Sequence, residues 1–171
     1  MSSPVIKYYK TKLKNVYLIK PPTIFKDMRG MYVETYNKKL FSRITRLNFI
    51  QDDISVSKKN VLRGIHGDKK TWKLISCILG KFYLVVVNND IKSKQYKKWI
   101  CILMDSKNPM QVLVPPKFGN GHYVVSKIAI FGYKQTTYYN RSGQFTIKWN
   151  DPNFKIKWPF KKKPITSKRD S

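Results

Sequence analysis

The run VLRGIHGD, residues 61–68, brings a proton-transfer group close to a phosphate-binding group. His66, one of two histidines in the sequence, can accept and return a proton near neutral pH. Arg63 offers a planar fork of donors that suits a phosphate. Residues three apart face opposite sides of a regular strand, so we expect Gly64 to form a bulge that turns both side chains into one cavity. The run therefore predicts enzyme chemistry on a phosphorylated or nucleotide-linked substrate.

The charge of the chain is strongly unbalanced. Lysines and arginines number 35 against nine acidic residues, which gives a formal net charge of +26 over 171 residues. Binding to nucleic acid would explain this charge. Nucleic-acid-binding proteins, however, gather their basic residues into one patch, whereas here the lysines are spread along the whole chain. Abundant Lys, Ile, Asn and Tyr also fit a drift towards AT-rich codons. We favour drift, with a general attraction for anionic substrates, and we do not expect nucleic acid as a partner.

Further composition limits the class of protein. Hydrophobic residues make up 42% and aromatic residues 14%, which indicates a folded core. No apolar run reaches the roughly 18 residues that span a bilayer, and residues 1–7 lack an apolar signal-peptide core. We therefore expect a cytoplasmic protein with no membrane contact. Cys77 and Cys101 lie in apolar runs without CxxC spacing, which is typical of buried, reduced thiols.

The elements that must position these groups are mostly strands. Short runs rich in β-branched and aromatic residues alternate with turn-forming segments. They occupy residues 82–87, 99–103, 111–114, 122–125, 128–133 and 144–149, and one short helix is expected near residues 37–46. Strands at this spacing predict an all-β antiparallel sandwich or barrel. With no repeat and no linker, we expect a single domain over residues 1–171.

An ordered series of motifs resembles the nucleotide-sugar 3,5-epimerases, of which dTDP-4-dehydrorhamnose 3,5-epimerase is the best known. The series covers almost the whole chain, and its number of pieces in one order is what makes the resemblance specific. It comprises FKDMRG at 25–30 with Glu34, QDD at 51–53, Ser55 and Ser57, LRGIH at 62–66, Lys73 and Leu74, Pro115 and Pro116, Tyr133 and Lys134, Tyr138 and Tyr139, WNDP at 149–152, IKWP at 156–159 and SKRD at 167–170.

The resemblance implies a cupin-type double-stranded β-helix, or jelly-roll, barrel with a few short helices, acting as a homodimer. It also implies a reaction: epimerisation at C3, C5 or both of a nucleotide-diphospho-4-keto-6-deoxy sugar, through an enolate, to supply an activated L-sugar such as L-rhamnose for surface glycans. The C4 ketone acidifies the neighbouring C–H bonds, so no cofactor is expected. No metal is expected either, because no glutamate lies near either histidine.

Two departures from the dTDP-sugar pattern leave the nucleotide open among dTDP, GDP and UDP. They leave the identity of the sugar open as well. Gly67 and Asp68 stand where that pattern has an aromatic residue and a glutamine, and Asn120 replaces a second histidine. RGIHGD together with GNGHYV looks more like the epimerases of GDP-4-keto-6-deoxy-heptoses. Gln51 follows the dTDP-sugar pattern instead.

Four catalytic roles follow from the resemblance. His66 is the base, Asp170 hydrogen-bonds the far nitrogen of its ring, Lys73 stabilises the negative charge at O4, and Tyr133 is the acid on the opposite face. Each residue also has an ordinary alternative. His66 could be a packed core histidine, Tyr133 one of many core aromatics, Lys73 a solvated lysine, and Asp170 a frayed residue next to the chain end.

The resemblance implies substrate contacts as well. The expected set is Arg63 and Arg29 on the diphosphate, Phe25, Glu34 and Gln51 on the nucleotide or sugar, either within one chain or across a dimer interface, Asn120 and His122 in the cavity, and Tyr139 in its lining. Two other functions stay open: a nucleotide-sugar 3,4-ketoisomerase of the same fold, and a non-catalytic basic binding module. Deuterium incorporation from heavy water distinguishes all three.

Overall fold

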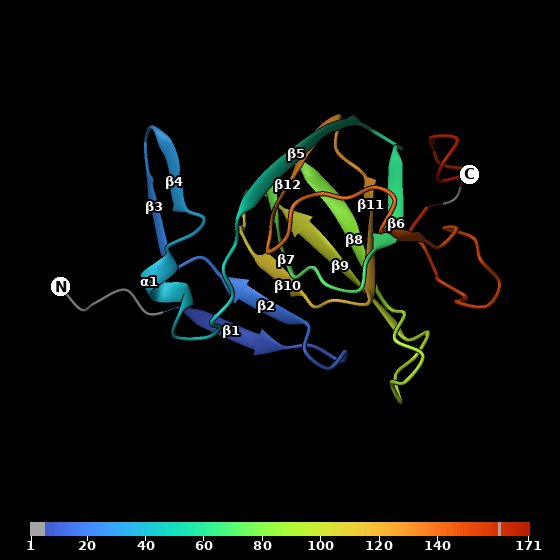
Figure 1. Ribbon diagram of the computed structural model, residues 1–171. Coiled ribbons are helices and arrows are strands. Elements are labelled where there is room, and N and C mark those ends of the chain that lie inside the picture. The colour runs from blue at the N-terminus through green and yellow to red at the C-terminus, as the bar shows by residue number, and fades with distance from the viewer. Residues whose placement is uncertain (1–5, 161) are drawn as a thin grey trace.

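The computed structural model describes residues 6–160 and 162–171. Two antiparallel sheets face each other and a separate hairpin stands to one side of them (Figure 1). The six-stranded sheet has the order β1(Lys7–Lys10), β2(Tyr17–Lys20), β10(Gln111–Val114), β7(Lys73–Leu79), β12(Ile128–Gln135) and β5(Gln51–Lys58). The five-stranded sheet has the order β13(Phe145–Thr146), β6(Leu62–Gly67), β11(Phe118–Val124), β8(Lys81–Asn88) and β9(Trp99–Asp105), and the hairpin joins β3(Thr23–Asp27) to β4(Gly30–Glu34). The predicted all-β architecture is confirmed.

Two predicted elements are shorter than expected. The helix α1 covers only Lys38–Phe41, because the backbone N–H groups of Arg43 and Ile44 bond to carbonyls three residues back and tighten the chain out of the α-helical path. The strand expected over residues 144–149 is reduced to β13. It ends early because the chain turns at Lys148, whose carbonyl accepts the N–H of Asp151.

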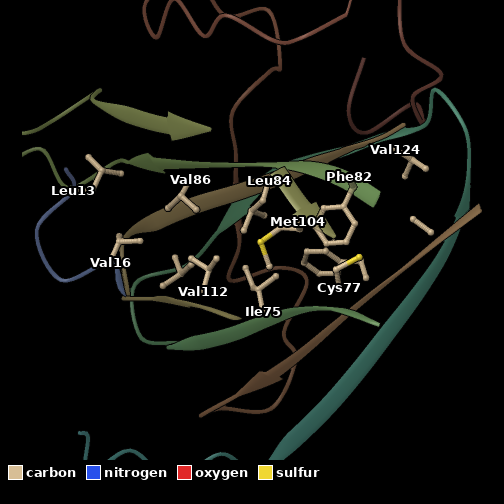
Figure 2. Close-up of a cluster of buried hydrophobic side chains, with 13 residues drawn as sticks. Leu13, Val16, Ile75, Cys77, Phe82, Leu84, Val86, Met104, Val112 and Val124 are labelled. Carbon is tan, nitrogen blue, oxygen red and sulfur yellow. The ribbon is translucent and has the colours of Figure 1, made fainter. Parts of the chain in front are cut away.

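The main core lies between the two sheets (Figure 2). Burial on both faces explains why the sequence of strand β8 is apolar without alternation. Leu84 and Val86 pack into the space between the sheets, whereas Val85 and Val87 pack on the other face against residues of the C-terminal segment, including Phe154. A strand covered on both faces needs apolar residues on both. The segment of residues 145–158 therefore contributes to the core.

A bulge at Gly64 shapes the strand that carries the predicted catalytic histidine. In the pairing of β6 with β11, His66 lies opposite Asn120 and Arg63 lies opposite His122, so β6 has one residue more than its partner over this stretch. Gly64 has φ +108°, a region that side-chain-bearing residues avoid. The bulge predicted from the sequence is confirmed, and it brings Arg63 and His66 to one side.

We expect Gly64→Ala to destabilise the fold by at least about 2 kcal/mol, since both steric crowding and a strained φ oppose it. A Cβ at this position would lie 2.6 Å from the Cα of Gly121 and 2.7 Å from the carbonyl oxygen of Asn120, and both are backbone atoms. Urea unfolding followed by circular dichroism measures the change. Gly30→Ala is the matched control, because its φ is also positive but no atom lies within 4 Å of an added Cβ. Equal losses would mean that backbone strain alone acts at Gly64.

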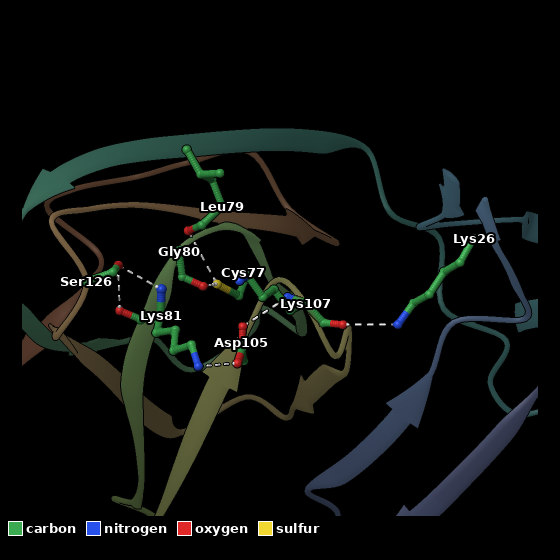
Figure 3. Close-up of polar contacts among 8 residues, drawn as sticks. All are labelled: Lys26, Cys77, Leu79, Gly80, Lys81, Asp105, Lys107 and Ser126. Atoms are coloured by element: carbon green, nitrogen blue, oxygen red, sulfur yellow. Dashed lines mark hydrogen bonds and ion pairs between the residues drawn. The ribbon is translucent and has the colours of Figure 1, made fainter. Parts of the chain in front are cut away.

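A polar contact connects the hairpin to the barrel (Figure 3). Lys26 Nζ of β3 donates to the carbonyl of Lys107 at 3.3 Å, next to the ion pair of Lys81 with Asp105 at 2.7 Å. Cys77 lies in this region, buried, and burial raises the pKa of its thiol to about 12. Cys101 is half-buried, and burial raises the pKa of its thiol too. Both are free thiols that react poorly at neutral pH.

Residues 1–5, on which the expectation about a signal peptide partly rests, lie outside the described residues. Within residues 6–160 and 162–171, no helix has the length and apolar character needed to cross a bilayer.

Candidate active site

A cavity of about 450 Å³ lies between the two sheets of the barrel. Strands of both sheets and the two C-terminal loops contribute to its wall. The lining residues are Ser55, Arg63, Gly64, His66, Lys73, Asn120, His122, Phe131, Tyr133, Tyr139, Arg141, Gln144, Ser167, Lys168, Arg169 and Asp170. Eight of the twelve residues expected in the site are among them.

His66 and Asp170 form a close pair in this cavity. Nε2 of His66 lies 2.7 Å from Oδ1 of Asp170. The carboxyl is only 3% exposed, and although burial pushes its pKa up, the hydrogen bond and charge of His66 hold that pKa below its usual range. Asp170 is not frayed, because Leu62 of β6 donates to the carbonyl of Ile165 at 2.9 Å and so ties the last segment to the barrel. A buried carboxylate on one ring nitrogen fixes the tautomer and leaves the other nitrogen for a substrate.

Lys73 is buried, unlike most lysines of this chain. It is 7% exposed, its Nζ lies 3.4 Å from Oδ1 of Asn120, and the same atom lies 5.8 Å from the centre of the Tyr133 ring. Burial lowers the pKa of the amine, against the opposing charge of Asp68. A partly desolvated cation with a single long hydrogen bond is well suited to bind a developing oxyanion.

Tyr133 lies on β12, on the wall formed by the six-stranded sheet. Burial raises the pKa of its phenol, and the neighbouring Asp53 carboxylate raises it further. The carboxylate is held in place by amide donors of Gln51 and Gln135. A phenol with a raised pKa keeps its proton across the neutral range. It can therefore give that proton to a carbanion but does not act as a resting base.

The mouth of the cavity is strongly basic. Arg63, Arg141 and Arg169 line it, three of only six arginines in the chain, together with Lys168. Nε of Arg63 donates to Oγ of Ser57 at 2.9 Å, which leaves the end of the guanidinium available. Arg169 is aimed by a 3.0 Å bond from Nη2 to Oε1 of Gln144. Such a set of planar cations can bind a diphosphate.

His122 and Asn120 both reach the cavity, since alternation along β11 places them on one face. His122 is 3% exposed and stacks on Phe131 with ring centres 4.3 Å apart and planes 7° apart. Burial, with help from the charge of Arg63, lowers the pKa of His122 to about 3, so the ring is neutral. Tyr139 lines the cavity from the loop that follows β12.

Four expected site residues do not reach this cavity. Arg29 bonds to Asp27 at the turn of the β3–β4 hairpin, and Phe25 is 66% exposed on β3. The hairpin stands to one side of the barrel (Figure 1), and none of its residues lines the cavity. Glu34 accepts from Thr23, and Gln51 accepts from the backbone N–H of Tyr139 and so positions the loop that follows β12. The contacts of these four residues with substrate stay predictions. They require either a second copy of the chain or a contact outside this cavity.

Several lining residues were absent from the set of expected site residues, although Ser167, Lys168 and Arg169 belong to the SKRD motif of the resemblance. Arg141, Gln144, Ser167, Lys168 and Arg169 lie on the loops after β12 and at the chain end. The scarcity of arginine is the signal that could have found two of them.

Within the described residues, no three His, Cys, Asp or Glu side chains come together as a metal site would require.

Comparison with known proteins gives consistent matches along the chain. The family model described as dTDP-4-dehydrorhamnose 3,5-epimerase matches residues 10–171. The dTDP-4-dehydrorhamnose 3,5-epimerase of Salmonella typhimurium is 36% identical, over 95% of this chain and 91% of its own length. The enzyme of the same name from Escherichia coli is 37% identical, over 94% of this chain and 89% of its own length.

Solved structures match as closely. The dTDP-6-deoxy-D-glucose-3,5-epimerase of Legionella pneumophila, in complex with dTDP-4-keto-L-rhamnose, gives a TM-score of 0.91 at 31% identity and covers 96% of this chain and 89% of its own. The dTDP-4-dehydrorhamnose 3,5-epimerase of Bacillus anthracis, with TDP and PPi bound, gives 0.90 at 32% identity and covers 97% of both chains. These matches confirm the predicted cupin-type fold.

Proposed function

Because this chain belongs to the family of dTDP-4-dehydrorhamnose 3,5-epimerases, we propose that it is an isomerase that inverts C3 and C5 of a nucleotide-diphospho-4-keto-6-deoxy sugar. The family predicted from the sequence motifs is confirmed. The observation that carries the proposal is that His66, Asp170, Lys73 and Tyr133 all meet at one cavity. These groups supply what inversion next to a ketone requires.

Inversion needs a base, an acid and a group that stabilises the enolate. His66, oriented by Asp170, removes the proton from the carbon next to the C4 ketone. The electron pair moves into the enolate, and the ammonium of Lys73 lowers the energy of the negative charge at O4. Tyr133 returns a proton to the opposite face, which inverts the centre. The ketone itself acidifies the C–H bond, so the proposed steps transfer protons only.

The nucleotide part of the substrate is assigned to the basic mouth. Arg63, Lys168 and Arg169 can hold the diphosphate, and the solved relatives support this class of ligand because one holds dTDP-4-keto-L-rhamnose and another holds TDP. We further propose a homodimer in which the β3–β4 hairpin of a second copy brings Phe25 and Arg29 to the nucleotide. This arrangement is favoured by the exposure of Phe25 and Arg29 and by the absence of both residues from the lining of the cavity of their own chain.

The test of this function is proton exchange in heavy water. The protein is incubated with dTDP-4-keto-6-deoxy-D-glucose, and NMR follows deuterium at C3 and C5 together with formation of the L-sugar. We expect label at both carbons. Label at a single carbon would reduce the activity to a mono-epimerase, and movement of the ketone from C4 to C3 would make the protein a ketoisomerase. Binding of nucleic acid with no exchange would favour the binding-module alternative.

A further inference from the structure

Two buried polar atoms in the wall of the cavity have no partner. Among the described residues, three buried side-chain atoms lack a hydrogen bond, and two of them, Oγ of Ser55 and Nε2 of His122, belong to residues that line this cavity. An unpaired buried polar group costs roughly 1–3 kcal/mol. That cost is recovered if a ligand in the cavity supplies the missing partner. The proposed mechanism uses neither residue.

The two residues belong to one layer of the wall. Ser55 of β5 is the strand partner of Phe131, and the ring of His122 stacks on the ring of Phe131. The next layer in one direction along β5 and β12 lies two residues away and holds the pair Asp53 and Tyr133, with Lys73 beside them. In the other direction, two residues after Ser55 on β5, Ser57 accepts a hydrogen bond from Arg63. The layer of Ser55 and His122 therefore lies between the proposed oxyanion group and the proposed phosphate group.

This position selects one edge of the sugar. With O4 near Lys73 and the diphosphate on C1 near Arg63, the wall between them faces either the C2–C3 edge or the C5–O5 edge of the ring. The first edge carries hydroxyl groups, and the second carries a methyl group and an ether oxygen. Unpaired polar atoms match the hydroxyl edge, because the other edge has one ether oxygen that can accept a hydrogen bond and no group that can donate one.

We propose that His122 and Ser55 bind the C2 hydroxyl of the sugar and so fix the orientation of the ring in the cavity. This inference rests on the proposed function. C2 is chosen over C3 because C3 inverts during the reaction, so its hydroxyl moves, whereas the C2 hydroxyl keeps its position. A neutral imidazole and a serine can each donate or accept, and a hydroxyl needs one of each. The role is one of specificity and positioning and involves no proton transfer.

The experiment compares two sugars on two proteins. dTDP-4-keto-6-deoxy-D-glucose and its 2-deoxy analogue are given to the wild type and to His122→Phe, which keeps the stack on Phe131 but removes both nitrogens. For the wild type we expect the 2-deoxy sugar to lower kcat/KM by about 10- to 100-fold. For His122→Phe we expect kcat/KM for the normal sugar to fall by a similar factor. The ratio of kcat/KM between the normal and the 2-deoxy sugar, the 2-deoxy penalty, should shrink at least threefold. Affinity for dTDP, which carries no hexose on its diphosphate, should change by less than twofold.

Each outcome decides the inference. A wild-type penalty below threefold, or a penalty that His122→Phe reduces by less than threefold, would overturn it while leaving the epimerase function intact. If His122→Phe does not fold, Ser55→Ala provides the same comparison, because it removes only a hydroxyl that has no partner. Failure of the wild type to exchange protons with the normal sugar would overturn the proposed function and this inference with it.

Discussion

Replacing His66 by asparagine should lower the rate of proton exchange at both C3 and C5 by about 10³-fold or more, the loss expected when a general base is removed. Asparagine is close in size and keeps a polar group near Asp170, but it cannot accept a proton at neutral pH. One base serving both carbons explains why both exchanges should fall together. Deuterium incorporation from heavy water, followed by NMR with each variant, measures the effect.

The control for His66→Asn is binding and stability. Affinity for dTDP should stay within about threefold of the wild type, because the mouth of the cavity is unchanged. The thermal midpoint should fall, because the buried Asp170 carboxyl loses its 2.7 Å bond to Nε2 of His66. Exchange that continues at a tenth of the wild-type rate or faster at either carbon would show that another group removes that proton.

The barrel strands were the most predictable part of the fold. Strand β8 is a run of β-branched and apolar residues, and burial on both faces explains why the signal is strong. Strand β5 was missed because its pattern is reversed. Ile54 and Val56 point outward with 70% and 57% exposure, whereas Ser55 and Ser57 point inward. An inward face that forms a cavity needs polar residues, so the usual rule of apolar inside and polar outside fails there.

The candidate site was predictable where local sequence determines geometry. The glycine at position 64 indicated a bulge, and the bulge places Arg63 and His66 together. Contacts between distant segments were not predictable from spacing alone. The pairing of Asp170 with His66 joins residues 104 positions apart, and only the resemblance to a family suggested it. Arg141 and Arg169 lie on loops whose path is set by packing, so no periodic pattern marks them.

The hairpin residues show a different limit. Arg29 and Phe25 were expected to contact substrate, yet in one chain they lie on an exposed hairpin outside the cavity. Sequence motifs record which residues a family uses but not which copy of the chain presents them. A site completed by a second copy would leave its contributing residues exposed in a single chain, as these are.

Replacing Tyr133 by phenylalanine should separate exchange from inversion. Without the phenol, His66 still removes the proton, but the enolate can regain one only from the face that lost it. We expect formation of the inverted sugar to fall about 10²- to 10³-fold, within the range for loss of a general acid. Deuterium should still enter with retained configuration, at a rate reduced much less. The inverted sugar and the labelled sugar of retained configuration are epimers, so NMR distinguishes them directly.

The matched control for this variant is Tyr96→Phe, which removes a phenolic hydroxyl outside the lining of the cavity and should leave both rates unchanged. Because burial raises the pKa of Tyr133, the phenol stays protonated up to high pH, so the wild type should not lose inversion through this group as pH rises from 7 to 9. Inversion by Tyr133→Phe at the wild-type rate would show that another donor, or water, protonates the second face. Equal loss of exchange and inversion would instead indicate that Tyr133 is needed to form the enolate, and the one-face base assigned to His66 would then be incomplete.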